Sequence, residues 1–316
     1  MSLPDLSGAP LFTVFTPTYN RAHTLHRVFN SLRVQTLSNI EWLVVDDGSD
    51  DKTPELIEAW SKRVNFPIRC FRQEHAGKHI AFNRALGKAR GYFFPASIPM
   101  MLVPDALEKL TQLWNSIPKR ERTDFYAVGG LCCDQNGEIT GDRFPTDPFD
   151  ADPRELRYVH HIRGEKWGFG LTDIIRRHPF PDVRGAQFIP EGIVWLAIAK
   201  NFKTRWTNEI VRTHYINDRE TGPTLSQRAS LGDHALGRWH YYRWLLNNDL
   251  AYFFYSPTPF LKAAIMLPIV GWFSGKSLRE ALMLDRFLTK ILVWLALPLS
   301  LLLYGVDRVR TKGPSL

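Results

Sequence analysis

The feature that most constrains this chain is an alternation of strand-like and helix-like segments in its first half. Short apolar or β-branched runs read LFTVFTP (11–17), EWLVVDDGS (41–49) and PIRCFRQ (67–73). The segments between them have apolar residues at helical spacing, as in TLHRVFNSLRVQ. Such alternation predicts a mostly parallel sheet with helices on both faces, and hence an α/β fold.

Polar residues follow the predicted strands, at the edge where ligands of parallel sheets bind. Asp46 and Asp47 end the second strand, and their carboxylates can accept hydrogen bonds from a base or a ribose, or can simply build a turn. Lys78 begins the third helix, where a cation can attract an anion or can be a solvated surface residue. No GxGxxG follows the first strand and no GxxxxGK[ST] occurs, which argues against a dinucleotide-binding oxidoreductase and a P-loop protein.

The pattern changes in the last third of the chain, where helical and aromatic segments dominate. We expect an α/β domain over 1–226 and a helical, apolar C-terminal region over 227–316. The run 291–306 carries no charge and lies between Lys290 and Arg308. A full membrane span needs roughly 20 apolar residues. A short or tilted span, a helix in the membrane interface and a buried core helix therefore all stay open, and the basic flanks favour contact with an anionic membrane surface.

Composition narrows the partners and the compartment. The net charge is +8, but no dense basic cluster with interleaved aromatic residues is present, so nucleic acid is not expected as a partner. Three cysteines without a CxxC pair indicate neither a disulfide framework nor a structural zinc site. The first residues have no basic start and no long apolar run, so we expect no signal peptide and a reduced, cytosolic setting.

Three blocks in fixed order over 11–110 carry a family resemblance: TVFTPTYNRAHTLHRVFNSLRVQTLSNIEWLVVDDGSDDKTPELI, HAGKHIAFNRALGKARGYFF and LVPDALEKL. They resemble the family 2 glycosyltransferases of the GT-A fold. Two further stretches, GEKWGFGLTDIIRRHPFP and FIPEGIVWLAIA, are similar to a bacterial branch that builds surface polysaccharides. Such enzymes move a sugar from a nucleotide-sugar, a UDP- or GDP-sugar, to an acceptor hydroxyl.

The resemblance implies roles for individual residues. Tyr19 would line the base pocket, Asp47 would contact the base, and Asp46 would lie nearby. The full donor-side set is Pro17, Tyr19, Asn20, Arg21, Asp46, Asp47 and Lys78. The acceptor side would include Glu165, Lys166 and Trp167, because tryptophan offers a flat face to a sugar ring.

The catalytic base implied by the resemblance is Glu191. Inverting members place an acid at a helix start, commonly as Glu-Asp, to take the proton of the acceptor hydroxyl. Here Glu191 matches the first acid and Gly192 replaces the second. A plain helix-start glutamate, favoured by the helix dipole, is the alternative. His214 is either a late metal ligand, as in some GT-A enzymes, or a structural histidine.

The metal motif of the family is absent. Members have D-x-D or a similar acid cluster after the fourth strand and use Mn²⁺ or Mg²⁺. An ungapped alignment on LVPDAL places Ser97, Ile98, Pro99 and Met100 on that motif. Divalent cations of this class need hard oxygen ligands, which isoleucine, proline and methionine side chains lack. No metal ligand is therefore assigned and no cofactor is certain.

These observations predict a glycosyltransferase, of inverting type, that transfers sugar to a lipid-linked or glycan acceptor in polysaccharide synthesis. We expect it at the cytoplasmic face of the bacterial inner membrane, held peripherally or by a short span. Because the metal acids are missing, a catalytically impaired or non-catalytic nucleotide-sugar-binding member is the main alternative. A structural membrane-interaction protein that keeps only the fold is the second.

Overall fold

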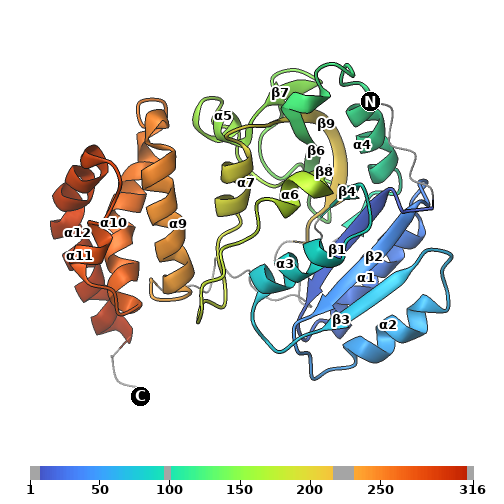
Figure 1. The fold of residues 1–316 in the computed structure, drawn as a ribbon, viewed down its shortest axis with the longest axis horizontal. Helices are drawn as coiled ribbons and strands as arrows, with labels where there is room; N and C mark the ends of the chain where they lie inside the picture. The colour runs from blue at the N-terminus through green and yellow to red at the C-terminus, as the bar shows by residue number, and fades with distance from the viewer. Residues whose placement is uncertain (1–7, 96–100, 216–230, 312–316) are drawn as a thin grey trace. The chain divides into compact units, whose positions relative to one another are not determined.

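The structure is a computed structural model that describes residues 8–95, 101–215 and 231–311 (Figure 1). The expectations about the turn at 97–100 therefore lie outside the described residues. The chain divides into two compact units. The first comprises Met1–Phe180 and Val194–Thr224, and the second comprises Pro181–Ile193 and Leu225–Leu316.

The first unit is built on a 9-stranded sheet in the order β3-β2-β1-β4-β8-β6-β9-β5, with β7 paired to β9. The strands are β1 (Phe12–Thr18), β2 (Ile40–Asp46), β3 (Ile68–Arg72), β4 (Phe93–Phe94), β5 (Met101–Leu102), β6 (Phe125–Cys133), β7 (Phe149–Ala151), β8 (Lys166–Leu171) and β9 (Lys203–Thr213). β1 pairs in parallel with β2 and β4, and β2 pairs in parallel with β3. The parallel α/β arrangement predicted for the first half is confirmed.

Helices connect and cover these strands. They are α1 (Ala22–Arg33), α2 (Thr53–Ser61), α3 (Lys78–Lys88), α4 (Ala106–Asn115), the short η1 (Arg122–Asp124), α5 (Pro153–Tyr158) and α6 (Thr172–Arg176). A further helix, α7 (Gly192–Ile198), begins in the second unit and continues in the first.

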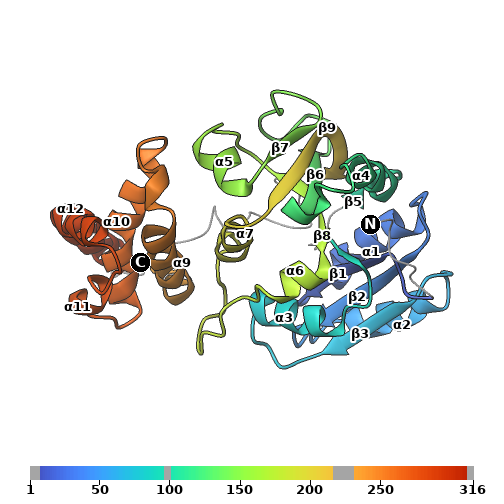
Figure 2. The same cartoon turned by 45° about the horizontal axis from the view of Figure 1, so that its top comes forward.

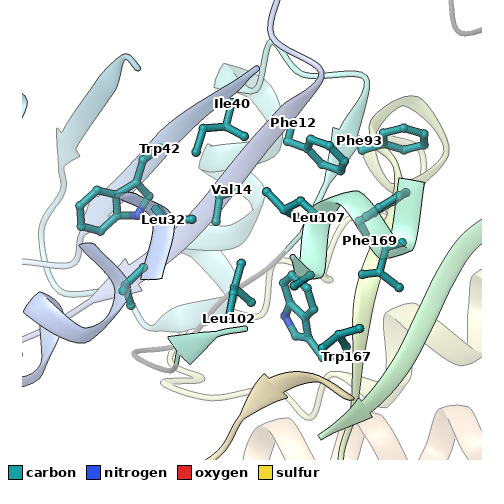
Figure 3. Close-up of a cluster of buried hydrophobic side chains, with 14 of the residues drawn as sticks. Phe12, Val14, Leu32, Ile40, Trp42, Phe93, Leu102, Leu107, Trp167 and Phe169 are labelled. Atoms are coloured by element: carbon teal, nitrogen blue, oxygen red, sulfur yellow. The ribbon is translucent and has the colours of Figure 1, made fainter. Parts of the chain in front are cut away.

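Apolar side chains cover both faces of β1. Phe12 and Val14 belong to a buried cluster with residues of α1, α2 and α4 (Figure 3). Phe15 contacts Phe82 of α3, with 5.8 Å between ring centroids. Since successive side chains of a strand point to opposite faces, β1 is buried on both sides. Even the threonines of β1, Thr13, Thr16 and Thr18, are buried.

The second unit is helical. It contains α9 (Ala235–Asn248), η2 (Leu250–Tyr252), α10 (Pro257–Phe273), α11 (Leu278–Ala281) and α12 (Phe287–Thr311). α10 packs against both α9 and α12 (Figure 2). The segment 181–193 belongs to this unit because it lies against α9: a side chain at Gly237 would collide with the backbone of Phe188.

α12 is the exposed apolar helix of this unit. Over 287–308 it is long and apolar enough to cross a membrane, and only 17% of its most apolar window is buried. Large apolar side chains that stay exposed on it are Phe287, Leu288, Ile291, Trp294, Leu295, Leu299, Leu301, Leu302, Leu303 and Val306. By contrast, most side chains of α10 from Ala263 to Gly271 are buried.

Candidate functional site

The carboxyl ends of the parallel strands share one edge of the sheet, called the carboxyl edge below. β8 is antiparallel to both β4 and β6, so β6 runs in the same direction as β4 and β1. β9 is parallel to β6. The carboxyl edge therefore holds the ends of β1, β2, β3, β6 and β9 and the start of β8, which is where ligands of such sheets bind.

Backbone hydrogen bonds join the loops along this edge. The amide of Asp47 donates to the carbonyl of Thr18 at 2.8 Å, and the amide of Gln73 donates to the carbonyl of Asp46 at 2.9 Å. The loops after β1, β2 and β3 are thus fixed to one another, so side chains from distant parts of the sequence keep defined relative positions.

Asn20 links the first two loops through its side chain and its backbone. Its φ of +51° is in the left-handed region, which asparagine tolerates better than most residues. Its side-chain oxygen accepts from the amide of Asp50 at 2.8 Å, and its own amide donates to Ser49 Oγ at 2.9 Å. These two contacts of Asn20 therefore hold the loop after β1 against the loop after β2.

Asp46 is almost fully buried and builds the turn after β2. Its Oδ1 accepts from the amide of Ser49 at 2.9 Å. Among the described residues its buried Oδ2 has no hydrogen-bond partner, and Arg72 Nε lies 3.9 Å from it. Gly48 shapes the same turn, because its φ is +87° and a Cβ there would lie 3.1 Å from the amide nitrogen of His75.

Asp47 holds the loop between β3 and α3. Its Oδ1 accepts from Gln73 Nε2 at 2.7 Å and from the amide of Ala76 at 2.9 Å. Its Oδ2 accepts from the amide of Gly77 at 2.9 Å and lies 3.0 Å from His75 Nδ1. Several short contacts to one loop show that this carboxylate positions the loop, a role that the sequence did not indicate.

An aromatic pair is exposed at the same edge. The rings of Tyr19 and His75 stack with 4.1 Å between centroids and 25° between planes. Tyr19 is 42% exposed, and the His75 side chain is 43% exposed. A flat, accessible ring can stack on a nucleobase of any kind. Sequence reasoning did not single out His75; the signal available was its place in QEHAGK at the end of β3.

The other donor-side residues lie at the ends of the same elements. Pro17 pairs with Val45 near the end of β1. Arg21 immediately precedes α1, and Lys78 is the first residue of α3. Gly77 before it has a φ of +96°, which favours glycine. The structure thus brings all the predicted donor-side residues to the carboxyl edge.

The start of β8 brings part of the predicted acceptor side to this edge. Glu165 directly precedes the strand, and its carboxylate lies 3.7 Å from Arg212 Nη2. Lys166 Nζ donates to the carbonyl of Arg163 at 2.9 Å. Burial lowers the pKa of Lys166, and nearby acidic groups offset only part of this effect.

Trp167 differs from its expected role. Its side chain is 5% exposed and packs in the buried cluster with Phe169 and Leu107 (Figure 3). The expectation of a flat face open to a sugar ring needs correction, because β8 is an interior strand and the indole points into the core beneath the helices.

A basic cluster lies where β9 ends. Arg212 is buried, and its Nη2 is 3.5 Å from His214 Nδ1. Burial, together with the Arg212 guanidinium, lowers the pKa of His214 and favours the neutral ring. Burial also raises the pKa of the neighbouring Cys132 thiol to about 11, so that thiol stays protonated and unreactive.

Glu191 lies in the segment 181–193, directly before α7. A Cβ added at Gly192 would lie 3.0 Å from the ring of Tyr241, so that ring would have to move for an aspartate. Crowding by Tyr241 is therefore a physical reason why the Glu-Asp pair expected from the resemblance reads Glu-Gly here.

A divalent cation of this class needs several oxygen or nitrogen side chains close together. Within residues 8–95, 101–215 and 231–308, no group of three or more His, Cys, Asp or Glu side chains could hold a metal ion. His214 neighbours an arginine, which repels a cation. The residues at 97–100 offer one neutral hydroxyl. The donors among the residues that the structure describes therefore do not fit Mn²⁺ or Mg²⁺.

Comparison with known proteins adds an independent line. The sequence model described as Glycosyl transferase family 2 matches residues 13–94. The chain is 30% identical over 197 residues to a Bacillus subtilis protein named as the teichuronic acid biosynthesis glycosyltransferase TuaG, covering 60% of this chain and 73% of TuaG. It is 33% identical over 174 residues to glycosyltransferase EpsH of the same organism, covering 53% of this chain and 47% of EpsH.

The chain spans less than half the length of several curated relatives. The alignments span between 23% and 47% of the length of EpsH and three further curated relatives. The crystal structure of S. aureus TarS 1–349 with UDP-GlcNAc matches with a TM-score of 0.54 and 16% identity, covering 93% of this chain and 81% of that one. At such identity the likeness concerns the fold, and it confirms the expected GT-A arrangement.

Proposed function

Because the chain belongs to the family 2 glycosyltransferases, we propose that it transfers a sugar from a UDP- or GDP-sugar to a lipid-linked or glycan acceptor in the synthesis of a bacterial surface polysaccharide. The observation that carries this proposal is the carboxyl edge, where an exposed Tyr19–His75 stack lies beside the buried carboxylates of Asp46 and Asp47. The name of TuaG refers to teichuronic acid, which supports a glycan acceptor. The TarS structure contains UDP-GlcNAc, which supports a nucleotide-sugar donor.

On the donor side, the proposed division of labour follows the contacts. The Tyr19 ring stacks on the nucleobase, and His75 supports it from the opposite face. Asp47 fixes the loop that carries His75, and the further expectation that it contacts the base stays part of the proposal. Lys78, at the start of α3, lies on the phosphate side because a helix N-terminus favours an anion.

The proposed reaction is a single inverting displacement. The acceptor hydroxyl oxygen forms a bond to the anomeric carbon while its proton passes to the carboxylate of Glu191. The bond between that carbon and the β-phosphate oxygen breaks, and its electron pair stays on the departing nucleoside diphosphate. Glu191 is supported by the residue type and by its place before α7.

The donor is tested by calorimetry on the full chain in mild detergent, with UDP, GDP and ADP as probes. We expect UDP or GDP to bind at least tenfold more tightly than ADP. Equal affinity for all probes, or none for any, would contradict a nucleotide-sugar site. Matched titrations with Tyr255→Ala, an exposed tyrosine of the second unit, control for general effects of losing a tyrosine ring.

A non-catalytic, nucleotide-sugar-binding role is the second candidate, and the residues Ser97, Ile98, Pro99 and Met100 favour it. The two candidates differ in turnover, not in binding. Release of nucleoside diphosphate is measured for wild type and Glu191→Gln, with and without an extract that contains acceptor glycans. Release that requires both the extract and Glu191 supports the catalytic role. Tight binding with no release above the Glu191→Gln background supports the binding protein.

We propose that α12 holds the protein at the cytoplasmic face of the membrane, peripherally or as a short span. Its exposed apolar face and its basic flanks, Arg286, Lys290 and Arg308, fit an anionic lipid surface. Replacing Trp294 and Leu295 by glutamate should reduce cosedimentation with phosphatidylserine vesicles about tenfold or more, because charge in hydrocarbon costs about 2.5–3.5 kcal/mol per residue. Val34→Glu, an exposed apolar position of the first unit, is the control. Cosedimentation unchanged by the double substitution would contradict the proposal.

A further inference from the structure

The end of β9 meets two elements that border the donor side. Met101 of β5 pairs with Thr213, and Leu102 pairs with Arg212. β5 also contacts α1, the helix that follows the Tyr19 loop. In the sequence, β5 directly follows the turn that lacks the family's acids. The register therefore places Arg212 beside the strand that leaves this turn.

A second arginine lies in the same place. The Arg27 guanidinium of α1 sits over the ring of Tyr215, 4.2 Å from its centroid. The Tyr215 hydroxyl donates to Met101 Sδ at 3.0 Å. Arg27 is 9% exposed, and the Arg212 side chain is 8% exposed. Two buried guanidinium groups thus lie next to His214 and Tyr215, the two described residues that follow β9.

The chemistry of a nucleotide-sugar requires positive charge at this edge. Its diphosphate is anionic in the bound donor, and more charge develops on it as the sugar leaves. Within the described part of the chain, the donors do not fit a divalent cation, and the residues at 97–100 offer one neutral hydroxyl. An arginine keeps its charge throughout the physiological pH range and binds phosphate oxygens through two parallel N–H groups. Burial strengthens such a contact because the local dielectric constant is low.

We propose that Arg212 is a protein-supplied substitute for the metal: its guanidinium binds the diphosphate of the nucleotide-sugar. This inference rests on the proposed donor. The carboxylate of Glu165, 3.7 Å away, partly offsets the charge of the guanidinium before the donor arrives. Donor binding is then independent of added divalent cations, and the affinity contributed by the diphosphate depends on Arg212 more than on residues near the base.

The test compares UDP with uridine and GDP with guanosine, by calorimetry on the full chain in EDTA. The ratio of nucleoside to diphosphate dissociation constants isolates the diphosphate contribution. Arg212→Gln should lower this ratio tenfold or more, since hydrogen bonds to charged groups are among the stronger ones. Nucleoside affinity should change less than twofold. Arg212→Lys, which keeps the charge but loses the paired geometry, should lower the ratio by an intermediate factor.

Arg205→Gln is the matched control. Arg205 lies on the same strand at similar burial, but at the opposite end, where it pairs with Asp150 at 2.7 Å. This substitution should lower the melting temperature without changing the ratio. If Arg212→Gln does not fold, the Arg212→Lys measurement decides in its place.

The outcomes separate the two proposals. The inference is overturned if both Arg212 variants have a ratio of dissociation constants within twofold of wild type. It is also overturned if the wild-type protein binds the diphosphate no more tightly than the nucleoside in EDTA and regains the difference when Mn²⁺ is added. In either case the proposed donor site survives, because the diphosphate still binds. Absence of UDP and GDP binding in every condition overturns the proposed function together with the inference.

Discussion

Asp47 and Arg212 carry opposite charges at similar depth on the same edge of the sheet, with side chains 5% and 8% exposed. Asp47 accepts short hydrogen bonds of 2.7–2.9 Å from one loop, two of them from backbone amides. The contacts described for Arg212 are to the side chains of Glu165 and His214, at 3.7 and 3.5 Å. Equal burial does not imply an equal role: the acid fixes the shape of the backbone, whereas the arginine lies beside ionisable side chains and is the residue proposed to bind the diphosphate.

The largest expected effect tests the acid half of this comparison. Asp47→Ala leaves three donors, Gln73 Nε2 and the amides of Ala76 and Gly77, without their acceptor. We expect the free energy of unfolding to fall by about 3 kcal/mol or more, at about 1–3 kcal/mol per unsatisfied buried group. Urea unfolding measures it, with Asp50→Ala, an exposed acid of the same stretch, as control. A loss below about 1 kcal/mol would show that the loop does not depend on this carboxylate.

The next effect separates binding from folding. Tyr19→Ala should weaken nucleoside binding by about 1–3 kcal/mol, the contribution of one base stacked on an aromatic ring. Because Tyr19 is 42% exposed, its removal should leave the unfolding transition nearly unchanged. Calorimetry and urea unfolding on the same preparation give both values. A large loss of stability with unchanged affinity would mean that Tyr19 belongs to the architecture, as Asp47 does.

A smaller effect concerns Asp51, whose contribution to the free energy of unfolding depends on pH. Asp51 accepts from the amides of Ala22 and Thr53, at the starts of α1 and α2. Burial raises its pKa, but hydrogen bonds from Thr53 and these amides outweigh burial and leave the pKa below 3.8. A lowered folded pKa means that the carboxylate stabilises the fold above the unfolded pKa and that this contribution is lost as pH falls through the folded pKa.

Asp51→Ala should therefore cost about 1 kcal/mol near neutral pH, as for a lost helix cap. The gap between wild type and variant should narrow as the pH drops below 3.8. Denaturant midpoints between pH 6 and pH 3 measure both curves. A gap that widens toward low pH would reverse the assigned sign.

The smallest effect tests the arginine half. Glu165→Gln removes the carboxylate 3.7 Å from Arg212, on a side chain that is 50% exposed. Exposed pairs contribute roughly 0–1 kcal/mol, so the diphosphate should bind about twofold more tightly and nucleoside affinity should not change. The gain should shrink as salt is raised. Weaker diphosphate binding would indicate that Glu165 orients the guanidinium and does not merely lower the potential around it.

Sequence patterns were sufficient for the order of the elements in the first half of the chain and for the positions where its first strands end. The apolar run 42–45, followed by Asp46 and Asp47, predicts both β2 and the acids at the carboxyl edge. Which side chains contact one another was not predictable from the sequence. Tyr19 meets His75 only because β1, β2 and β3 pair in parallel and bring their loops together.

The sequence also could not predict in which direction an individual side chain points. Trp167 could be placed on a strand, but its burial depends on which face of β8 the helices cover. Arg212 carries no motif, and its position became visible only through its pairing with β5. The membership of 181–193 in the second unit depends on contacts with α9, which follows it more than 40 residues later in the chain.

The path of the chain between the two units limits which fragments of the protein can fold on their own. The chain enters the second unit at Pro181, returns to the first at Val194 and leaves it again after Thr224. No single cut yields two intact halves. A fragment ending near residue 226 would carry the apolar side chains of Ile189 and Ile193 without the helix they normally accompany, and is expected to aggregate. Recombination between such proteins should therefore preserve the pair 181–193 and α9 as one inherited block.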